Sequence, residues 1–464
     1  MKIQFNNFDI KDYEAFLKCK DLNHADYDSN SCITDEQSYK LVFGGIENKA
    51  IQINNNNLFD YQSHVVNKAL AVKRYAAFLD CGLGKTLIQL NWCKAISDNK
   101  GKVLLLCPLQ VIKEFYNDIE KFNIDVKITN LRENKNWTSG IGILNTESLT
   151  GSAFEKINLS DIHGVCLDES SILKNGDGAT SKTLRKISKD IEYRLACSAT
   201  PSPNEQAEYG SHAVFLGYFK SLNEFYSRFF RKDGNKWLLK DWAVNPFYRF
   251  LSRWSVYIQN PNKLGFENGG YLTEKYELIK MYSEAPQYMG NTLFTNSLDM
   301  KDRVKIYGKL RSDTTLKRFN DCVTKASEYK SIVWAYRNSE EKVFKNAIQG
   351  SVLITGATPI EQRIEFIEGF KLGQIKTLIS KPKILGWGVN LQQAEAHVFS
   401  GYNDSFEQWY QAIRRSHRNG RKGRLKVFAP ITEPETPIFN NIIRKEKTFE
   451  NDAIELQKRF NNIL

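Results

Sequence analysis

The feature that most constrains this fold is a glycine-rich loop between a short apolar run and a stretch with helical spacing. The loop reads Asp80-Cys81-Gly82-Leu83-Gly84-Lys85-Thr86 and follows Ala76-Ala77-Phe78-Leu79. Backbone amides of such a loop, with the N-terminus of the next helix, can cradle phosphate oxygens. Lys85 would supply charge to the β- and γ-phosphates, and the Thr86 hydroxyl would ligate Mg²⁺. The order strand, loop, helix predicts nucleotide binding, although Leu79 stands where the strict pattern has glycine.

The apolar runs along the chain predict two α/β lobes. At 464 residues the chain is longer than one ordinary domain. Strands are expected at 76–79, 103–107, 142–144, 165–167 and 194–197, and a second series at 332–335, 352–354, 377–379, 396–399 and 426–428. Helices are expected at 86–97, 360–370 and 406–417. Strands that alternate with helices imply parallel sheets flanked by helices on both faces.

The two series of strands and helices set the expected domain boundaries. We expect an N-terminal arm or small accessory element at 1–55, with a short helix near 13–19, and a first lobe at 56–204. A mostly helical insertion and linker would span 205–325, a second lobe 326–432, and a helical tail 433–464. Aromatic residues dominate the insertion, and at helical spacing they are more often core than base-stacking platforms. We expect these aromatic residues to form a core, with one of them as a candidate for stacking on a base.

Composition adds supporting evidence. Lysine and arginine exceed aspartate and glutamate by 65 to 53, a net charge of +12. The excess favours a polyanionic partner, and a solvated basic surface explains it equally well. The 8 cysteines include no Cys-x-x-Cys pair, which argues against a zinc ribbon and fits reduced core residues. Without a signal segment or bilayer-length apolar run, a soluble cytoplasmic protein is expected.

Two polar segments follow apolar runs in the first lobe. Asp168 and Glu169 come after 164–167: Asp168 can hold Mg²⁺ through its water shell, and Glu169 can orient and deprotonate water. Ser198-Ala199-Thr200 come after 195–197, and their hydroxyls can hydrogen-bond the acidic pair and sense its state. Each has an ordinary alternative, a solvated turn for the pair and a Ser/Thr-Pro turn for the second segment.

Three further candidates complete the pattern. The Gln62 amide can both donate to and accept from an adenine edge, or Gln62 is an ordinary helix residue. Arg415 and Arg418 are three apart, so on a helix they would share one face and could reach a γ-phosphate as arginine fingers; the alternative is a basic surface helix. Gly388 belongs to a second glycine-marked loop, which allows close backbone approach or forms a plain turn.

Taken in order, these segments resemble helicase superfamily two, and within it the Swi/Snf-type DNA translocases, especially short phage-borne members. The matching segments are Leu58 with Tyr61 and Gln62 (the adenine-reading element), 80–86 (motif I), 107–115 (Ia), 167–175 (II), 198–201 with Asn204 (III), 377–391 (V) and 411–421 (VI). Motif II lacks the final histidine or aspartate of commoner forms, which weakens a DEAD-box assignment. Motif III reads Ser-Ala-Thr, which is more helicase-like than the Gly-Thr form of many remodellers.

The resemblance implies ATP hydrolysis, with Mg²⁺, at a cleft between two RecA-like lobes. Tyr61, Gln62, 82–86 and Gly388 would bind ATP, and Gln411 would join Glu169, Arg415 and Arg418 in catalysis. Ser198, Ala199 and Thr200 would couple the lobes to the nucleotide. Nucleic acid would contact Pro108, Lys113, Lys174, Lys381 and Lys383, although each lysine is equally well explained as solvated.

The expected partner is double-stranded or branched DNA, with replication or recombination proteins as further candidates, and the expected state is a monomer. Two alternatives stay open: a strand-separating DNA or RNA helicase, and a nucleotide-gated module that binds DNA and recruits other proteins. A P-loop kinase of small molecules is remote, because it leaves the motifs of the second lobe unexplained.

Overall fold

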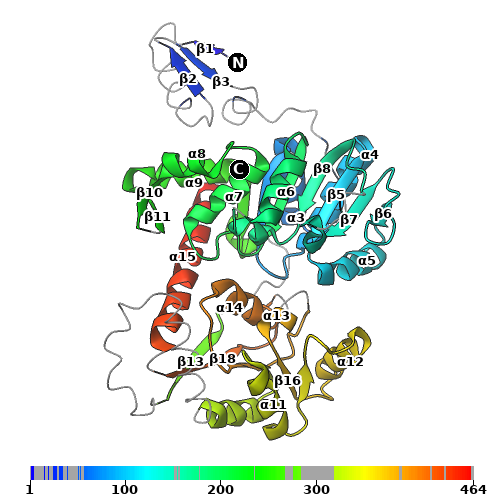
Figure 1. The fold of residues 1–464 in the computed structure, drawn as a ribbon, viewed down its shortest axis with the longest axis vertical. Helices are drawn as coiled ribbons and strands as arrows, with labels where there is room; N and C mark the ends of the chain where they lie inside the picture. Colours follow the sequence, from blue (N-terminus) through cyan, green and yellow to red (C-terminus); the bar gives the residue numbers. More distant parts are fainter. Residues whose placement is uncertain are drawn as a thin grey trace. The chain divides into compact units, whose positions relative to one another are not determined.

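The chain folds into two compact units, shown in Figure 1. The computed structural model describes residues 57–150, 157–176, 178–234, 236–266, 275–283, 318–385, 389–418, 421–432 and 435–460, the strands 2–4, 25–28 and 31–34, and residues 15, 19, 39, 51, 53 and 154. The first unit comprises residues 1–268 and 449–464, and the second comprises 269–448. Each unit contains one parallel sheet.

The sheet of the first unit has seven strands, each parallel to its neighbours. Across the sheet they are β12 (Ser255–Ile258), β4 (Arg74–Leu79), β9 (Tyr193–Ser198), β8 (Ile162–Leu167), β5 (Lys102–Cys107), β7 (Ile141–Asn145) and β6 (Ile128–Asn130). The helices are α3 (Asp60–Val72), α4 (Lys85–Asn99), α5 (Ile112–Lys121), α6 (Ala179–Ser188) and α7 (Tyr209–Leu216), with single turns η1 (Leu109–Val111), η2 (Thr146–Thr150), η4 (Ser170–Lys174) and η5 (Gln206–Glu208). The central strands are buried except at the first residues of β4 and β8, because a parallel sheet is covered on both faces.

An aromatic helical subdomain follows in the first unit. It contains α8 (Leu222–Phe229), the antiparallel hairpin β10 (Phe230–Asp233) and β11 (Lys236–Leu239), η6 (Asp241–Ala243), α9 (Val244–Trp254) and η7 (Pro261–Leu264). Phe225 lies at its centre, with its ring centroid 5.4 Å from those of Phe219 and Phe229. The expected aromatic core is therefore confirmed. Trp242 is the exception, because 67% of its surface is exposed.

The sheet of the second unit has six parallel strands. They are β13 (Glu277–Ser283), β18 (Lys426–Thr432), β17 (Ala396–Phe399), β14 (Ser331–Trp334), β16 (Thr377–Ser380) and β15 (Val352–Ile354), in that order. The helices are α11 (Asn338–Ala347), α12 (Ile360–Lys371), α13 (Pro382–Leu385) and α14 (Phe406–Ile413). Two RecA-like α/β lobes are thus confirmed.

The division of the chain differs from the expected boundaries. Residues 205–325 were expected to form a mostly helical insertion, but β12 pairs with β4 at the edge of the first sheet and β13 pairs with β18 at the edge of the second. Both are edge strands, and the neighbouring strand completes their hydrogen bonds. Spacing along the sequence does not reveal such a neighbour, so these strands were missed.

The ends of the chain differ in structure. The strands β1 (Lys2–Gln4), β2 (Ala25–Asp28) and β3 (Ser31–Thr34) form a small antiparallel sheet, while most of the helix expected at 13–19 lies outside the described residues. At the other end, α15 (Thr436–Phe460) begins in the second unit, and its residues from 449 onward belong to the first unit. All cysteines are free and buried. Among the described helices, none is long and apolar enough to cross a membrane.

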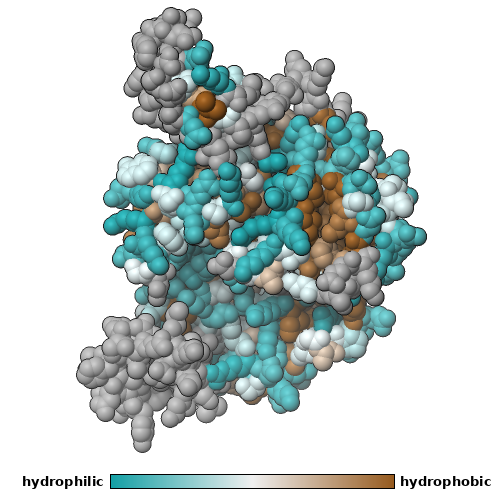
Figure 2. All heavy atoms as spheres, turned by 45° about the horizontal axis from the view of Figure 1, so that its top comes forward, coloured by the Kyte–Doolittle hydropathy of each residue, from teal (hydrophilic) through white to brown (hydrophobic). Residues whose placement is uncertain are grey.

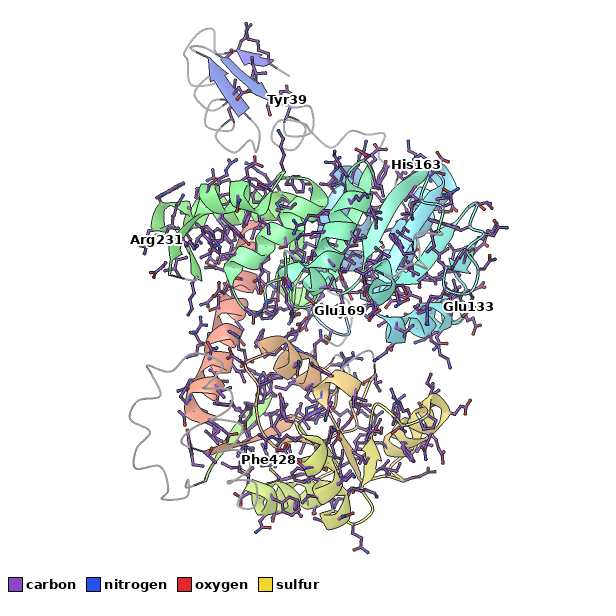
Figure 3. The ribbon with its side chains drawn as sticks, in the orientation of Figure 1. Tyr39, Glu133, His163, Glu169, Arg231 and Phe428 are labelled. Atoms are coloured by element: carbon purple, nitrogen blue, oxygen red, sulfur yellow. The ribbon has the colours of Figure 1, made fainter. Side chains whose placement is uncertain are left out.

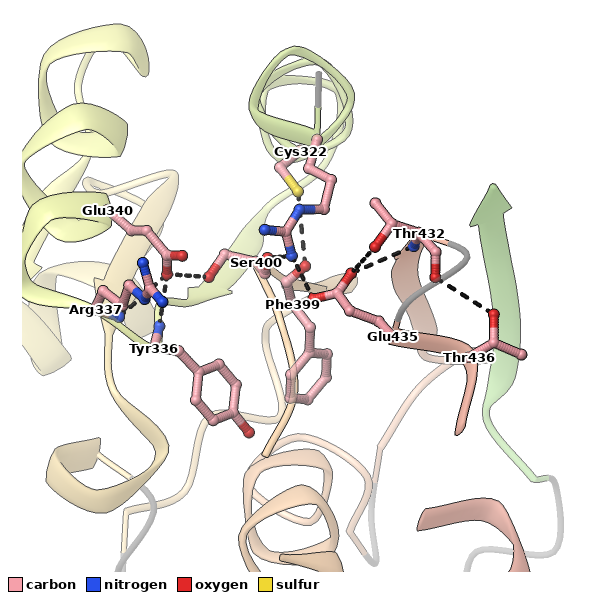
Figure 4. A network of polar contacts seen from close by, with 10 residues as sticks. Cys322, Tyr336, Arg337, Glu340, Phe399, Ser400, Thr432, Glu435 and Thr436 are labelled. Atoms are coloured by element: carbon pink, nitrogen blue, oxygen red, sulfur yellow. Dashed lines mark hydrogen bonds and ion pairs between the residues drawn. The ribbon is translucent and has the colours of Figure 1, made fainter. Parts of the chain in front are cut away.

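A buried polar network anchors the start of α15 within the second unit (Figure 4). Arg318 Nη1 lies 2.6 Å from Glu435 Oε1, and both side chains are buried. The other carboxylate oxygen of Glu435 accepts a 2.8 Å hydrogen bond from the Thr432 hydroxyl. Arg318 also donates to the carbonyl oxygen of Ser400, whose hydroxyl donates to Glu340. The network joins the ends of β17 and β18 to α15.

Candidate functional site

The glycine loop after β4 has the backbone of a phosphate cradle. Gly82 and Gly84 have φ values of +87° and +71°, which side-chain-bearing residues rarely adopt. A Cβ on Gly84 would also lie 2.2 Å from the Gln62 Nε2 atom. Leu79, at the position where the strict pattern has glycine, is the buried last residue of β4. The Leu79 carbonyl accepts a hydrogen bond from Lys85, while the Leu79 side chain is buried in the core, so a side chain is tolerated at this position.

Lys85 is held beneath this loop at the start of α4. Its Nζ atom donates to the carbonyl oxygens of Leu79 at 3.1 Å and Asp80 at 3.5 Å. Burial by itself would lower the pKa of the ammonium, but nearby negative charges outweigh it and raise that pKa. Those charges belong to Cys81, Glu169, Asp168 and Asp80. The loop and the acidic pair therefore form one electrostatic site with a permanently charged lysine.

Two side chains from α3 cover the loop. Tyr61 and Gln62 are buried, and both donate to the carbonyl oxygen of Leu83, at 2.9 Å and 3.1 Å. The Gln62 Oε1 atom accepts from the Phe59 amide at 3.0 Å. Both ends of the Gln62 amide thus have protein partners in this structure. Contact with an adenine edge, as expected from the sequence, would require Gln62 to exchange these hydrogen bonds.

The acidic pair lies at the end of β8, the strand next to β9 and β5. Figure 3 shows Glu169 at this edge of the sheet. Burial raises the pKa of Asp168, while the Gln89 hydrogen bond and the Lys85 charge act in the opposite direction. Glu169 has a φ of +48°, a left-handed conformation that is rare for a glutamate. Such strain at a carboxylate that could orient water is typical of functional sites.

The segment after β9 lies between the loop after β4 and the acidic pair after β8, because β9 separates those strands. Ser198, Ala199 and Thr200 are all buried. Ser198 Oγ accepts from the Thr200 amide at 3.1 Å, and within the described part of the chain the Thr200 hydroxyl has no hydrogen-bond partner. The expected hydrogen bonds from these hydroxyls to the acidic pair are therefore not made here.

Two residues that the sequence did not single out support the acidic pair. Gln89 Nε2 donates to Asp168 Oδ1 at 2.8 Å, and Ser170 Oγ lies 3.0 Å from His212 Nε2. Gln89 follows Lys85 by four positions, so helical spacing alone places both on one face of α4. His212 comes from α7 and is fully buried. No pattern in the sequence links it to Ser170.

The second unit holds the arginine segment. The helix expected over 406–417 ends at Ile413, so Arg415 and Arg418 do not share a helix face. The Arg415 carbonyl accepts instead from the Leu391 amide, and the Ser416 hydroxyl bonds to His397. These tertiary contacts turn the chain away from the helix axis.

The two arginines have different surroundings. Arg415 is 2% exposed and its Nη2 atom donates to Gln411 Oε1 at 2.8 Å, whereas Arg418 is half-buried and donates to the Arg414 carbonyl. Gly388 lies outside the described residues.

The candidate nucleic-acid contacts are scattered over both units. In the first unit, Lys113 is exposed at the start of α5, just after Pro108. Burial raises the pKa of Glu208, and the charge of Lys174 is one of the groups that act in the opposite direction. In the second, Lys383 is exposed and Lys381 donates to Asn338 Oδ1. Lys174 and Lys381 thus already interact with protein groups. The solvated alternative fits Lys113 and Lys383.

The fold and the site together define a two-lobed P-loop NTPase of the helicase type. Residues 75–241 match the model of the SNF2-related domain, and residues 314–420 match that of the helicase conserved C-terminal domain. The chain belongs to the SNF2-related, Swi/Snf-type branch of helicase superfamily two.

Several known proteins are similar to the chain. YwqA of Bacillus subtilis, described as an ATP-dependent helicase/translocase, is 22% identical to this chain. The match covers 85% of this chain and 48% of YwqA. MG018 of Mycoplasma genitalium, named an uncharacterized ATP-dependent helicase, is 23% identical over 87% of this chain and 42% of its own. The chain thus spans less than half the length of these relatives. The SWI2/SNF2 ATPase core of Sulfolobus solfataricus, solved with double-stranded DNA, is 17% identical with a TM-score of 0.42, over 90% of this chain and 96% of that one.

Proposed function

We propose that this protein is an ATP-driven nucleic-acid motor that translocates on DNA. The observation that carries the proposal is the joint site at the carboxyl edge of the first sheet. There Lys85 is held under the glycine loop, and its pKa is raised by the Asp168 and Glu169 charges, among others. The helicase C-terminal domain supplies the second lobe that a motor of this family needs.

The residues of the first unit would divide the work on ATP. The amides of 82–86 and the Lys85 ammonium bind the phosphates. Glu169, whose backbone has a left-handed φ of +48°, would accept a proton from the attacking water. Arg415 and Arg418 would stabilise the charge that develops on the γ-phosphate. Of the two, Arg418 is the better candidate, because its side chain is only half-buried, whereas Arg415 is buried and bonded to the Gln411 side chain.

The oxygen atoms near the loop fit a magnesium ion. The Thr86 hydroxyl has no hydrogen-bond partner among the described residues, and Gln89 occupies only Oδ1 of Asp168. A hydroxyl and a carboxylate oxygen are hard ligands of the kind Mg²⁺ binds directly or through water. When bound there, the ion would neutralise phosphate charge.

An ATPase assay with and without nucleic acid tests the proposal. Wild-type protein should hydrolyse ATP faster with DNA, and Lys85→Ala should abolish hydrolysis. Binding of DNA should weaken as salt rises, because phosphate contacts release counterions. Absence of stimulation by single-stranded, duplex or forked DNA, and by RNA, would exclude a motor.

The alternatives give different results in the same experiments. A strand-separating helicase unwinds a forked duplex, whereas a duplex translocase displaces a triplex strand without unwinding. A nucleotide-gated recruitment module forms its complex in Glu169→Gln as well, without movement along DNA.

A further inference from the structure

We propose that the β10–β11 hairpin, with Trp242, is an additional nucleic-acid contact that holds an unpaired strand. This inference rests on the proposed function and adds a contact outside the motifs described above. The hairpin belongs to the aromatic helical subdomain and lies at the end of the first unit opposite β6 (Figure 1).

The register of the hairpin places Arg231, Asp233 and Lys236 on one exposed face and Lys232 on the other. Arg231 pairs with Leu238 and Asp233 with Lys236, and because side chains alternate across a strand these four share one face. All four are exposed. Figure 3 shows Arg231 at the margin of the unit, and in Figure 2 the same side of the unit is mostly hydrophilic.

The cations of this hairpin, which are Arg231, Lys232 and Lys236, are exposed and outside any ion pair within the described part of the chain. With the single carboxylate of Asp233, these three cations leave the hairpin with a net positive charge, which complements a polyanion. Phosphate groups spaced along a nucleic-acid strand are such a partner.

Trp242 supplies the second half of the site. It follows the hairpin by three residues, is 67% exposed, and among the described aromatic rings none packs against it. Lys240 lies 5.3 Å from its ring centroid and is itself fixed by a 2.6 Å hydrogen bond to the Ser227 carbonyl. An exposed indole beside a cation is the arrangement that stacks bases of single strands without sequence preference.

The hairpin is also held rigidly enough to bind without reordering. Trp237 stacks on Tyr226 of α8, with centroids 4.6 Å apart and planes at 24°. The Lys240 amide donates to the Phe229 carbonyl at 2.9 Å. The buried Phe230 ring joins the hairpin to the aromatic core. These contacts hold the hairpin backbone in place before binding, which reduces the conformational entropy that the hairpin loses on contact.

The test measures binding of the full chain to labelled oligothymidylate over a range of salt. The triple variant Arg231→Gln, Lys232→Gln, Lys236→Gln should weaken binding, and the slope of log Kd against log salt should fall by about 0.7 per lost phosphate contact. The control triple Lys100→Gln, Lys121→Gln, Lys127→Gln removes equal charge from exposed sites on the same unit. Equal weakening by both triples would show a general charge effect and overturn the proposal.

Trp242 is tested with a base-free probe. Trp242→Ala should weaken oligothymidylate binding roughly tenfold, while Trp242→Phe keeps most of the affinity. On an abasic oligonucleotide of equal length, wild type and Trp242→Ala should bind alike. Equal loss on both probes, or no loss on oligothymidylate, would overturn the stacking role.

The ATPase separates this inference from the proposed function. If no nucleic acid stimulates the wild-type ATPase, the motor itself is excluded. If DNA stimulates wild type and both hairpin variants at the same oligonucleotide concentrations, only the hairpin inference fails.

Discussion

Gln89 Nε2 donates a 2.8 Å hydrogen bond to Asp168 Oδ1, so the helix that begins with Lys85 also holds the carboxylate at the end of β8. The phosphate loop and the acidic pair are thereby fixed to each other by a side chain outside both motifs. Asp168 is buried, and burial raises its pKa. Gln89 is one of the groups that counteract this rise.

Loss of Gln89 should therefore shift the pH dependence of the ATPase. In Gln89→Ala the pKa of Asp168 rises further, so the acidic limb of the rate profile moves to higher pH. The rate should fall about tenfold, as expected for a lost hydrogen bond to a charged group. Lys94→Ala, in the same helix but paired with Asp98 and not with the acidic pair, is the control. Superimposable pH profiles of Gln89→Ala and wild type would contradict the prediction.

His212 should act on catalysis through Ser170. Its ring is buried beside Phe78, and burial lowers its pKa to about 4, so it is neutral at physiological pH. Ser170→Ala removes the 3.0 Å contact but keeps the packing. It should lower kcat several-fold with little change in the KM for ATP, because the residue that follows Glu169 is then no longer tied to α7. His212→Ala adds a cavity and should also cost about 2–4 kcal/mol of stability. A Ser170→Ala enzyme with wild-type kcat would refute this role.

The two arginines of the second unit should behave differently. Arg418→Ala should leave ATP binding nearly unchanged and slow hydrolysis, as expected for a finger that acts in the transition state. Arg415→Ala leaves the Gln411 amide without its 2.8 Å partner, so it should lower thermal stability as well. Equilibrium binding of a labelled nucleotide, single-turnover rates and melting curves distinguish these effects. Weaker ATP binding as the sole defect of Arg418→Ala would argue against the finger.

Asp452 should make the first unit less stable as pH rises. It is 1% exposed near the end of α15 and accepts hydrogen bonds from Tyr248 at 2.6 Å and Gln206 at 2.7 Å. Burial raises its pKa from 3.8 to about 6, so between these values the folded state holds a proton that the unfolded chain has lost. Stability then falls as pH rises from about 4 to 6 and is constant above that.

The variant Asp452→Asn should remove this dependence. It keeps the acceptor oxygen, and at pH 7.5 it should be more stable than wild type by up to about 3 kcal/mol. The gain should vanish near pH 4, where both forms are neutral. Melting curves of the two proteins across this range provide the measurement, with other titrating groups cancelling in the difference. A gain that does not change with pH would rule out titration of Asp452 as its cause.

Much of the architecture could be predicted from the sequence. The runs that became β4, β5, β8 and β9 are continuous apolar stretches, and continuous burial is readable without a partner. The edge strands β12 and β13 could not be predicted in this way, because their hydrogen bonds depend on β4 and β18. The end of α14 at Ile413 was also missed. Beyond it the amides of Arg415 and Ser416 bond to carbonyls three positions back instead of four, and Leu391 and His397 hold the segment through tertiary hydrogen bonds that no local pattern reveals.

By itself the sequence determined the phosphate loop and the order of the motifs. Glycines with positive φ, a lysine and a threonine at the start of a helix are local requirements, and local requirements appear as residue types at fixed spacing. The tertiary structure alone decided which groups support that site. Gln89 reaches Asp168 and His212 reaches Ser170 only because neighbouring elements of one folded unit bring them within hydrogen-bond distance. Such distances depend on packing between residues far apart in the chain, which no local pattern encodes.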